Sequence, residues 1–151
     1  MSSEPAIKDQ SLKPIRTVFM GTPDFAVPGF EALAADPDFS IVAVVTKPDR
    51  PAGRGRTLTP PPIKEAALKH GYLILQPLKV REIEGDIQAL APDLIVVIAY
   101  GQIIPASILD IPVHGCLNVH ASLLPKYRGA ACLAAAIKNG DRETGVTVMK
   151  M

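Results

Sequence analysis

Short, mainly apolar runs constrain the fold of this chain more than any other feature. The clearest is LIVVIA at 94–99. Similar runs lie at 15–21, 41–46, 115–120 and 145–151, with a weaker one at 72–76. These runs are continuous rather than alternating, which is typical of strands that are covered on both faces. The sequence therefore predicts a buried β-sheet.

Segments with the character of helices separate these runs. They lie at 29–35, 61–70, 81–91 and 130–140. The second begins with prolines and ends at Gly71, which are the usual start and stop signals of a helix. For the first, we expect Thr22 to cap the helix and Pro23 or Pro28 to occupy its first turn. Strands that alternate with helices predict an α/β fold with an open, mostly parallel sheet, and 151 residues suit one domain.

Charge, cysteine content and hydropathy exclude several classes of function. The formal net charge is +1, so any attraction to nucleic acid or to a membrane must come from a local patch. Cys116 and Cys132 match no metal-binding spacing, and we expect reduced, buried thiols in a cytoplasmic protein without a metal site. The longest apolar run is too short to span a bilayer, so we expect no membrane association. We interpret residues 1–14 as a disordered leader, since they lack the apolar stretch of a secretory signal.

Three loops follow strands of the predicted sheet and carry the candidate functional residues. They contain GTPDF after the first strand, YGQIIP after residues 94–99, and NVHASLLP at the end of residues 115–120. Because ligands bind beyond the carboxyl ends of parallel strands, all three loops are expected to line one crevice. GTPDF has one glycine where a dinucleotide fingerprint needs three, so a plain strand-to-helix turn explains it at least as well.

Asn118 and His120 are the strongest catalytic candidates. They lie two positions apart on a strand, so their side chains share one face of the sheet. A histidine beside an amide donor can stabilise a developing oxyanion and move a proton. The alternative is that His120 is a structural histidine that is hydrogen-bonded to the turn after it. We interpret His70, at a helix end, and His114, before a strand, as structural.

The loop after these residues has a composition that suits contact with a ligand. Leu123 and Leu124 lie beside backbone that Pro125 interrupts, and this combination suits a flat heteroaromatic ligand with polar edges. A hydrophobic plug that packs the loop explains the same residues equally well.

A basic arm at residues 46–57, TKPDRPAGRGRT, has four cations and one anion, Asp49. The cations are Lys47, Arg50, Arg54 and Arg56. Its glycines and prolines exclude a helix or a central strand, so we expect a long, mobile, unstructured insertion. Such an arm can neutralise phosphates of a nucleic acid. The alternative is a solvated surface loop.

Taken together, five segments resemble the methionyl-tRNA formyltransferases in order and spacing, from about Ile15 to the last residue. They are VFMGTPDFAVP, VVTKPDRPAGRGRTLTPPPIKEAA, VVIAYGQIIP, CLNVHASLLPKYRGAACLAAAI and NGDRETGVTVMKM. HASLLP is shared by the wider family of transferases that depend on 10-formyltetrahydrofolate. The TKPDRPAGRG arm is typical of the tRNA enzymes, in which the matching loop enters the acceptor stem.

The resemblance implies a formyltransferase domain over residues 15–151, with a Rossmann-like sheet. It implies formyl transfer from 10-formyltetrahydrofolate to the methionyl amine of initiator tRNA during translation initiation, by a cytoplasmic monomer that uses no metal. The implied catalytic residues are Asn118 and His120. The implied folate-border residues are Ser122, Leu123, Leu124 and Pro125. The implied tRNA-binding residues are Lys47, Arg50, Arg54 and Arg56.

Three departures from the family pattern shape our expectations. The catalytic aspartate of the family and its C-terminal β-barrel domain fall beyond Met151, and Cys132-Leu133-Ala134-Ala135 replaces a segment that usually has proline and polar residues. We therefore expect a truncated, incomplete domain that is inactive as it stands. The alternatives are a short paralogue that binds folate or RNA without chemistry, and a formyltransferase with a small-molecule acceptor.

Overall fold

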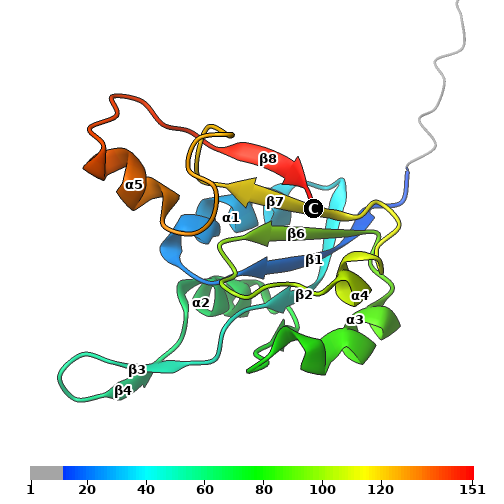
Figure 1. Ribbon diagram of the computed structural model, residues 1–151. Coiled ribbons are helices and arrows are strands. Elements are labelled where there is room, and N and C mark those ends of the chain that lie inside the picture. The colour runs from blue at the N-terminus through cyan, green and yellow to red at the C-terminus, as the bar shows by residue number, and fades with distance from the viewer. Residues whose placement is uncertain (1–11) are drawn as a thin grey trace, which may run out of the picture.

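The computed structural model describes residues 12–151, so most of the expected leader at 1–14 lies outside the described residues. Its centre is a six-stranded sheet with the order β5-β2-β1-β6-β7-β8 (Figure 1). Five strands run parallel, and β8 pairs with β7 in the antiparallel direction. The strands are β1 Ile15–Gly21, β2 Phe39–Val45, β5 Ile74–Leu75, β6 Leu94–Ile98, β7 Cys116–His120 and β8 Thr147–Lys150. The predicted open, mostly parallel α/β sheet is confirmed.

Helices cover both faces of this sheet. They are α1 Val27–Ala35, α2 Pro62–His70, α3 Glu84–Leu90, α4 Ala106–Leu109 and α5 Cys132–Lys138, with short 3-10 turns η1 Asp24–Ala26 and η2 Val80–Ile83. On β1, Val18 and Met20 pack into a core with residues of α3 and α4, while Phe19 packs into a second core with α1 and α2. All three side chains are fully buried. This two-sided burial explains why the strand sequences are continuously apolar.

Aromatic rings contribute to the core between the sheet and α1. Phe30 of α1 meets Phe19 edge to face, with ring centroids 5.2 Å apart. At the end of α2, His70 stacks on Tyr72 with centroids 5.4 Å apart, and its Nε2 lies 2.7 Å from a carboxylate oxygen of Glu31. These contacts join α1 to α2 and agree with the structural role expected for His70.

The helix signals are confirmed in part. Gly71 caps α2 in the left-handed conformation, with φ 74°, and Pro28 lies in the first turn of α1. The expected cap at Thr22 is wrong, because the turn η1 intervenes and Ala26 precedes α1. The Thr22 hydroxyl instead donates a hydrogen bond to the Tyr100 carbonyl at 2.9 Å, which ties the loop after β1 to the loop after β6.

The basic arm is ordered, and the expectation of an unstructured insertion is wrong. Strands β3 Arg50–Ala52 and β4 Thr57–Thr59 form an antiparallel hairpin that extends away from the body of the protein (Figure 1). Gly53 has φ 73° and opens the turn, while β-branched threonines occupy β4. Pro51 is tolerated because a two-stranded ribbon has only edge strands. The arm is therefore a separate small sheet.

The expectation of free, buried cysteines is confirmed within residues 12–151. Cys116 and Cys132 are free and buried, and burial raises the pKa of Cys116 to about 11. The described residues contain no group of three or more histidine, cysteine, aspartate or glutamate side chains placed to hold a metal ion. None of the described helices has the length and apolar character needed to traverse a membrane.

Candidate active site

The carboxyl ends of β1, β6 and β7 open into one cavity of about 470 Å³. This arrangement follows from the parallel pairing of β1 with β6 and of β6 with β7, which brings the three strand ends to one edge of the sheet. The lining residues are Pro23, Phe25, Val97, Ala99, Tyr100, Gly101, Gln102, Ile104, Asn118, Val119, His120, Ala121, Gly129, Ala130, Ala131, Cys132, Leu133 and Met151. The prediction that the three loops share one crevice is confirmed.

Asn118 and His120 both line this cavity and an adjoining one of about 610 Å³. They lie in β7 between β6 and β8, and Asn118 pairs in register with Val97 on one side and Met149 on the other. Among the described residues, no hydrogen bond uses the Asn118 side chain, so its amide is available to a ligand in the cavity. An amide donor held by a central strand has the rigidity that oxyanion stabilisation needs.

The two ring nitrogens of His120 have different surroundings. Its Nε2 lies 2.8 Å from the Tyr127 carbonyl oxygen. Because a carbonyl only accepts hydrogen bonds, Nε2 carries the proton, and in the neutral ring Nδ1 keeps the lone pair. Nδ1 has no partner among residues 12–151. The histidine thus makes the contact with the following turn that a structural role requires, and it keeps one nitrogen free for chemistry.

The loop after β7 is held inside the protein by Ser122 and Thr147. The fully buried Ser122 donates from its hydroxyl to the Lys126 carbonyl at 2.7 Å. Its own carbonyl accepts from the Thr147 hydroxyl at 2.7 Å, and that hydroxyl also accepts from the Leu124 amide at 3.1 Å. The Ser122 side chain is therefore hydrogen-bonded within the loop and lines neither of the two cavities.

The four candidate border residues occupy different surroundings. Leu124 lines the adjoining cavity together with Arg128. Leu123 is half exposed and packs beside Gly145, where an added Cβ would lie 2.7 Å from its side chain. Ser122 and Pro125 line neither of the two cavities.

Residues that sequence reasoning passed over complete the cavity. The Tyr100 hydroxyl is buried without a partner among the described residues, and burial raises the pKa of Tyr100 to about 12. The Gln102 side chain accepts from the Val80 amide at 2.8 Å and donates to the Leu78 carbonyl at 3.1 Å, which ties the loop after β6 to η2. Both residues lie in the YGQIIP segment, so the position of that segment after a predicted strand was the signal that could have identified them.

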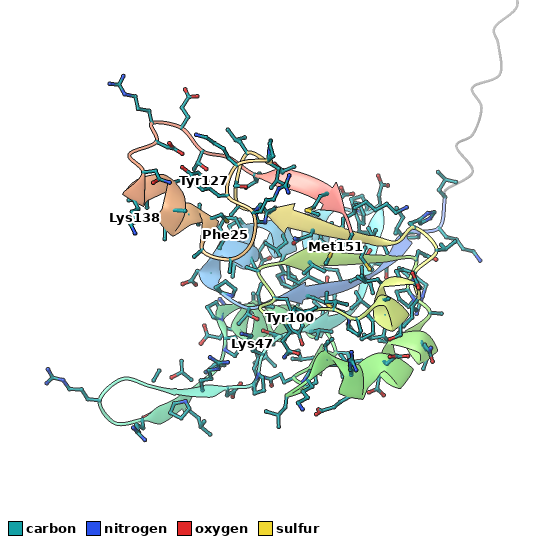
Figure 2. The ribbon with its side chains drawn as sticks, in the orientation of Figure 1. Phe25, Lys47, Tyr100, Tyr127, Lys138 and Met151 are labelled. Carbon is teal, nitrogen blue, oxygen red and sulfur yellow. The ribbon has the colours of Figure 1, made fainter. Side chains whose placement is uncertain are left out.

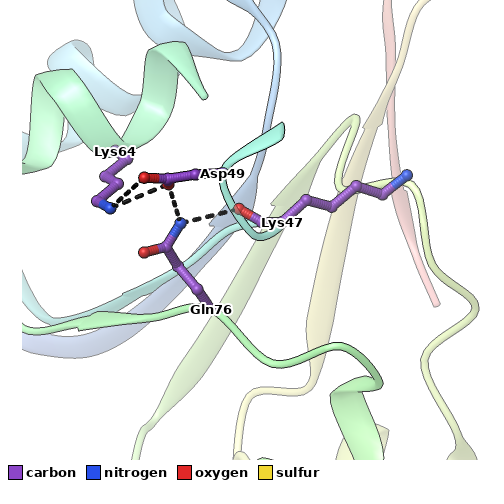
Figure 3. A network of polar contacts seen from close by, with 4 residues as sticks. All are labelled: Lys47, Asp49, Lys64 and Gln76. Carbon is purple, nitrogen blue, oxygen red and sulfur yellow. Dashed lines mark hydrogen bonds and ion pairs between the residues drawn. The ribbon is translucent and has the colours of Figure 1, made fainter. Parts of the chain in front are cut away.

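The base of the basic arm is fixed by a polar network (Figure 3). The Asp49 carboxylate accepts from Lys64 Nζ at 2.9 and 3.0 Å and from Gln76 Nε2 at 2.8 Å. Gln76 Nε2 also donates to the Lys47 carbonyl at 3.1 Å. The hydrogen bonds from Gln76 and then from Lys64 lower the pKa of Asp49. The one anion of the arm is therefore hydrogen-bonded to the protein body, and the four cations determine the charge of the rest of the arm.

Those four cations do not lie together. Lys47 and Arg50 line a third cavity of about 320 Å³ at the base of the arm, beside Thr22. Arg54 and Arg56 belong to the turn between β3 and β4. The Lys47 side chain points away from the Asp49 network toward the rim of the main cavity, where a Cβ at Gly101 would lie 2.6 Å from its Nζ (Figure 3).

A family model described as formyl transferase matches residues 15–151 of this chain. A methionyl-tRNA formyltransferase from Geobacter sulfurreducens is 57% identical over 139 residues, which cover 91% of this chain and 44% of the relative. One from Trichlorobacter lovleyi is 59% identical over 138 residues, covering 90% of this chain and 43% of the relative. The chain thus spans less than half the length of these relatives.

Solved structures support the fold alone. A phosphoribosylglycinamide formyltransferase from Anaplasma phagocytophilum superposes with a TM-score of 0.70 at 19% identity, covering 92% of this chain and 65% of that one. A glycinamide ribonucleotide transformylase from Symbiobacterium toebii superposes with a TM-score of 0.66 at 21% identity, covering 92% and 66%.

Proposed function

The chain belongs to the formyl transferase family, and from that premise we propose that it carries the donor site and catalytic residues of a methionyl-tRNA formyltransferase. Such an enzyme transfers a formyl group from 10-formyltetrahydrofolate to the methionyl amine of initiator tRNA. The observation that carries the proposal is the cavity at the strand ends, into which one strand brings both Asn118 and His120. Its volume of about 470 Å³ lies in the range of small-molecule sites, and it is lined mainly by apolar side chains.

The proposed chemistry assigns one task to each residue. The methionyl amine forms a C–N bond with the formyl carbon, the bond from that carbon to N10 of the folate breaks, and one proton passes from the amine to N10. The Asn118 amide donates to the formyl oxygen as negative charge develops there. His120, in its imidazolium form, donates to the same oxygen through Nδ1. Removal of one such donor costs on the order of a hundredfold to a thousandfold in rate.

The folate donor is proposed to lie along the loop that follows β7. Leu124 lines the cavity that adjoins the main one, and Leu123 and Pro125 belong to the same loop. Ser122 would act indirectly, since its buried hydroxyl holds the loop backbone at Lys126. Apolar side chains beside backbone polar groups suit the flat, polar-edged ring system of a folate.

The basic arm is proposed to contact the tRNA. Lys47 and Arg50 at its base and Arg54 and Arg56 in its turn carry positive charge from the rim of the main cavity to the end of the hairpin. Phosphate contacts from such a row hold a nucleic acid in register while its end enters the site. Two alternatives remain: a protein that binds folate or RNA without chemistry, and a formyltransferase with a small-molecule acceptor.

The test is a formylation assay with radiolabelled 10-formyltetrahydrofolate and methionine-charged initiator tRNA. The chain is assayed after extension with the remaining residues of the Geobacter sulfurreducens relative, of which it matches 44%. Binding of a stable 10-formyl folate analogue and of the tRNA is measured on the same preparation. Formylation that Asn118→Ala and His120→Ala abolish, while the analogue still binds, supports the proposal. Binding of analogue and tRNA without any formylation favours the non-catalytic alternative, and formylation of glycinamide ribonucleotide but not of tRNA favours the small-molecule acceptor.

A further inference from the structure

We infer that Tyr127 and Asp141 are positioning residues for His120, because they hold the Tyr127 carbonyl where it accepts the Nε2 proton of the histidine. The effect on catalysis rests on the proposed function, whereas the hydrogen bonds themselves do not depend on it. The Tyr127 carbonyl lies 2.8 Å from His120 Nε2 and 3.3 Å from the Ser122 hydroxyl. One backbone oxygen therefore meets two side chains from the end of β7.

The backbone at Tyr127 does not adopt this position by its own preference. Tyr127 has φ 52°, in the left-handed region, which is unfavourable for an L-residue with a side chain. Such a conformation persists only where the surrounding contacts determine it. The direction of the carbonyl depends on this backbone angle, so whatever holds Tyr127 also directs the acceptor of the His120 proton.

The contacts that hold Tyr127 come from the segment between α5 and β8. The Tyr127 hydroxyl donates to the Asp141 carboxylate at 2.6 Å and accepts from Asn139 Nδ2 at 3.1 Å. Lys126 Nζ lies 3.2 Å from the same carboxylate oxygen. The hydrogen bond from Tyr127 and then that from Lys126 lower the pKa of Asp141, so the acceptor stays ionised to a lower pH than an ordinary aspartate. Figure 2 shows Tyr127 where the loop after β7 passes close to this segment.

The consequence for His120 is a fixed tautomer and a fixed ring orientation. While Nε2 donates to the Tyr127 carbonyl, Nδ1 is left for the reaction: it holds the lone pair in the neutral ring and takes up the proton that the imidazolium form donates. If the carbonyl moved away, Nε2 would lose its acceptor, and both the tautomer and the ring angle would be free to change. A reacting group displaced by about 1 Å can lose on the order of a hundredfold in rate. Asp141 therefore acts on the reaction through Tyr127, and Tyr127 acts through its backbone.

The experiment follows the Nε2-bound proton of His120 by ¹H–¹⁵N spectroscopy of the chain labelled with ¹⁵N-histidine, at a pH where the ring is neutral. His120→Gln assigns the signal. In the wild type we expect one tautomer and slow exchange of this proton with water. In Tyr127→Phe and in Asp141→Ala we expect exchange to be at least tenfold faster. Asp141→Asn keeps an acceptor oxygen for the tyrosine hydroxyl and should retain most of the protection.

The matched control is Tyr72→Phe, which removes a hydroxyl from a tyrosine that packs against His70 rather than in this loop. It should leave the His120 signal unchanged, and the signals of His70 and His114 should report that each variant is folded. An unchanged His120 signal in both Tyr127→Phe and Asp141→Ala would overturn the inference. If Tyr127→Phe fails to fold, Asp141→Ala compared with Asp141→Asn decides the same question.

A kinetic comparison connects the inference to the reaction. If the chain formylates tRNA, Tyr127→Phe should lower kcat by about tenfold to a hundredfold and leave the KM for the folate unchanged. A raised KM at constant kcat would instead make Tyr127 a binding group. The spectroscopic result does not depend on activity. An extended chain that binds the folate analogue and tRNA but transfers no formyl group would count against the proposed function, and the His120 proton would still decide this inference.

Discussion

Two glycines contact the same residue, Ile98, and alanine at each should have opposite effects on stability. At Gly21, the last residue of β1, a Cβ would lie 2.8 Å from the Ile98 carbonyl oxygen, 2.8 Å from Phe19 Cε1 and 3.0 Å from Ala26 Cβ. At Gly29, in α1, a Cβ would meet only Ile98, with Cδ1 at 2.5 Å. The first site opposes backbone and buried core, whereas the second opposes the end of a flexible side chain.

The expected magnitudes follow from these contacts. Overpacking at Gly21 should cost about 1–3 kcal/mol of the free energy of unfolding, because neither the sheet backbone nor Phe19 has space to move. At Gly29, a rotation of Ile98 removes the clash, and alanine in a helix interior gains about 1 kcal/mol over glycine. We therefore expect Gly21→Ala to be less stable than Gly29→Ala by about 2 kcal/mol or more.

The assay is equilibrium urea unfolding of the wild type and both variants, with the midpoint compared at constant m-value. Gly21→Ala should unfold at lower urea, and Gly29→Ala should unfold at or above the wild-type midpoint. A Gly21→Ala protein as stable as the wild type would show that β1 and β6 separate easily at the floor of the cavity. Equal destabilisation of both variants would show that the loss of stability does not depend on whether the new Cβ meets backbone or the end of a side chain.

Further outcomes concern the site and the arm. Tyr100→Phe should stabilise the protein by about 1 kcal/mol, since it removes a buried hydroxyl without a partner. Because the pKa of Tyr100 is raised to about 12 in the folded state, its contribution to stability is complete below pH 10 and is lost between pH 10 and 12. Stability should therefore fall by more in the wild type than in the variant, which still contains Cys116 with its raised pKa; unfolding at pH 9 and 11 measures the difference. In steady-state formylation by the extended chain, Asn118→Ala and His120→Ala should each lower kcat on the order of a hundredfold or more with little change in folate affinity. A loss of folate affinity at constant kcat would contradict the assigned roles. Arg50→Ala combined with Arg54→Ala should flatten the plot of log K against log salt for tRNA by about two units, whereas an unchanged slope in a tRNA titration would make the arm a solvated loop.

The sequence predicted those parts of the fold that depend on burial. The runs at β1 and β6 are apolar on both faces because helices cover both faces, and this pattern is readable without coordinates. The joint placement of the three loops also followed, because parallel strands end at one edge of the sheet. Helix α4 was missed because its four residues, Ala106–Leu109, are too few for helical periodicity to show.

The remaining features depend on contacts between residues far apart in the sequence. Thr22 has the side chain of a helix cap, but the Tyr100 carbonyl, 78 residues away, is its acceptor. The basic arm lacks helical or strand periodicity, yet its two short strands satisfy each other's backbone, which a pattern of side chains does not reveal. The hydrogen bond from His120 to the Tyr127 carbonyl depends on a left-handed backbone at a residue with a large side chain, and no local preference predicts that conformation.

The Asp49 carboxylate at the base of the arm is hydrogen-bonded to residues outside the arm. Those residues therefore influence the electric field around the arm. Lys64 of α2 and Gln76 beyond β5 hold the Asp49 carboxylate at the protein body. A substitution at Lys64 that removed its charge would leave this carboxylate less neutralised, and the potential that a polyanion meets at the arm would fall with no arm residue changed. Affinity for a phosphate-bearing partner can thus be adjusted in small steps from a helix that the partner does not need to contact, while the cations of the arm stay in place.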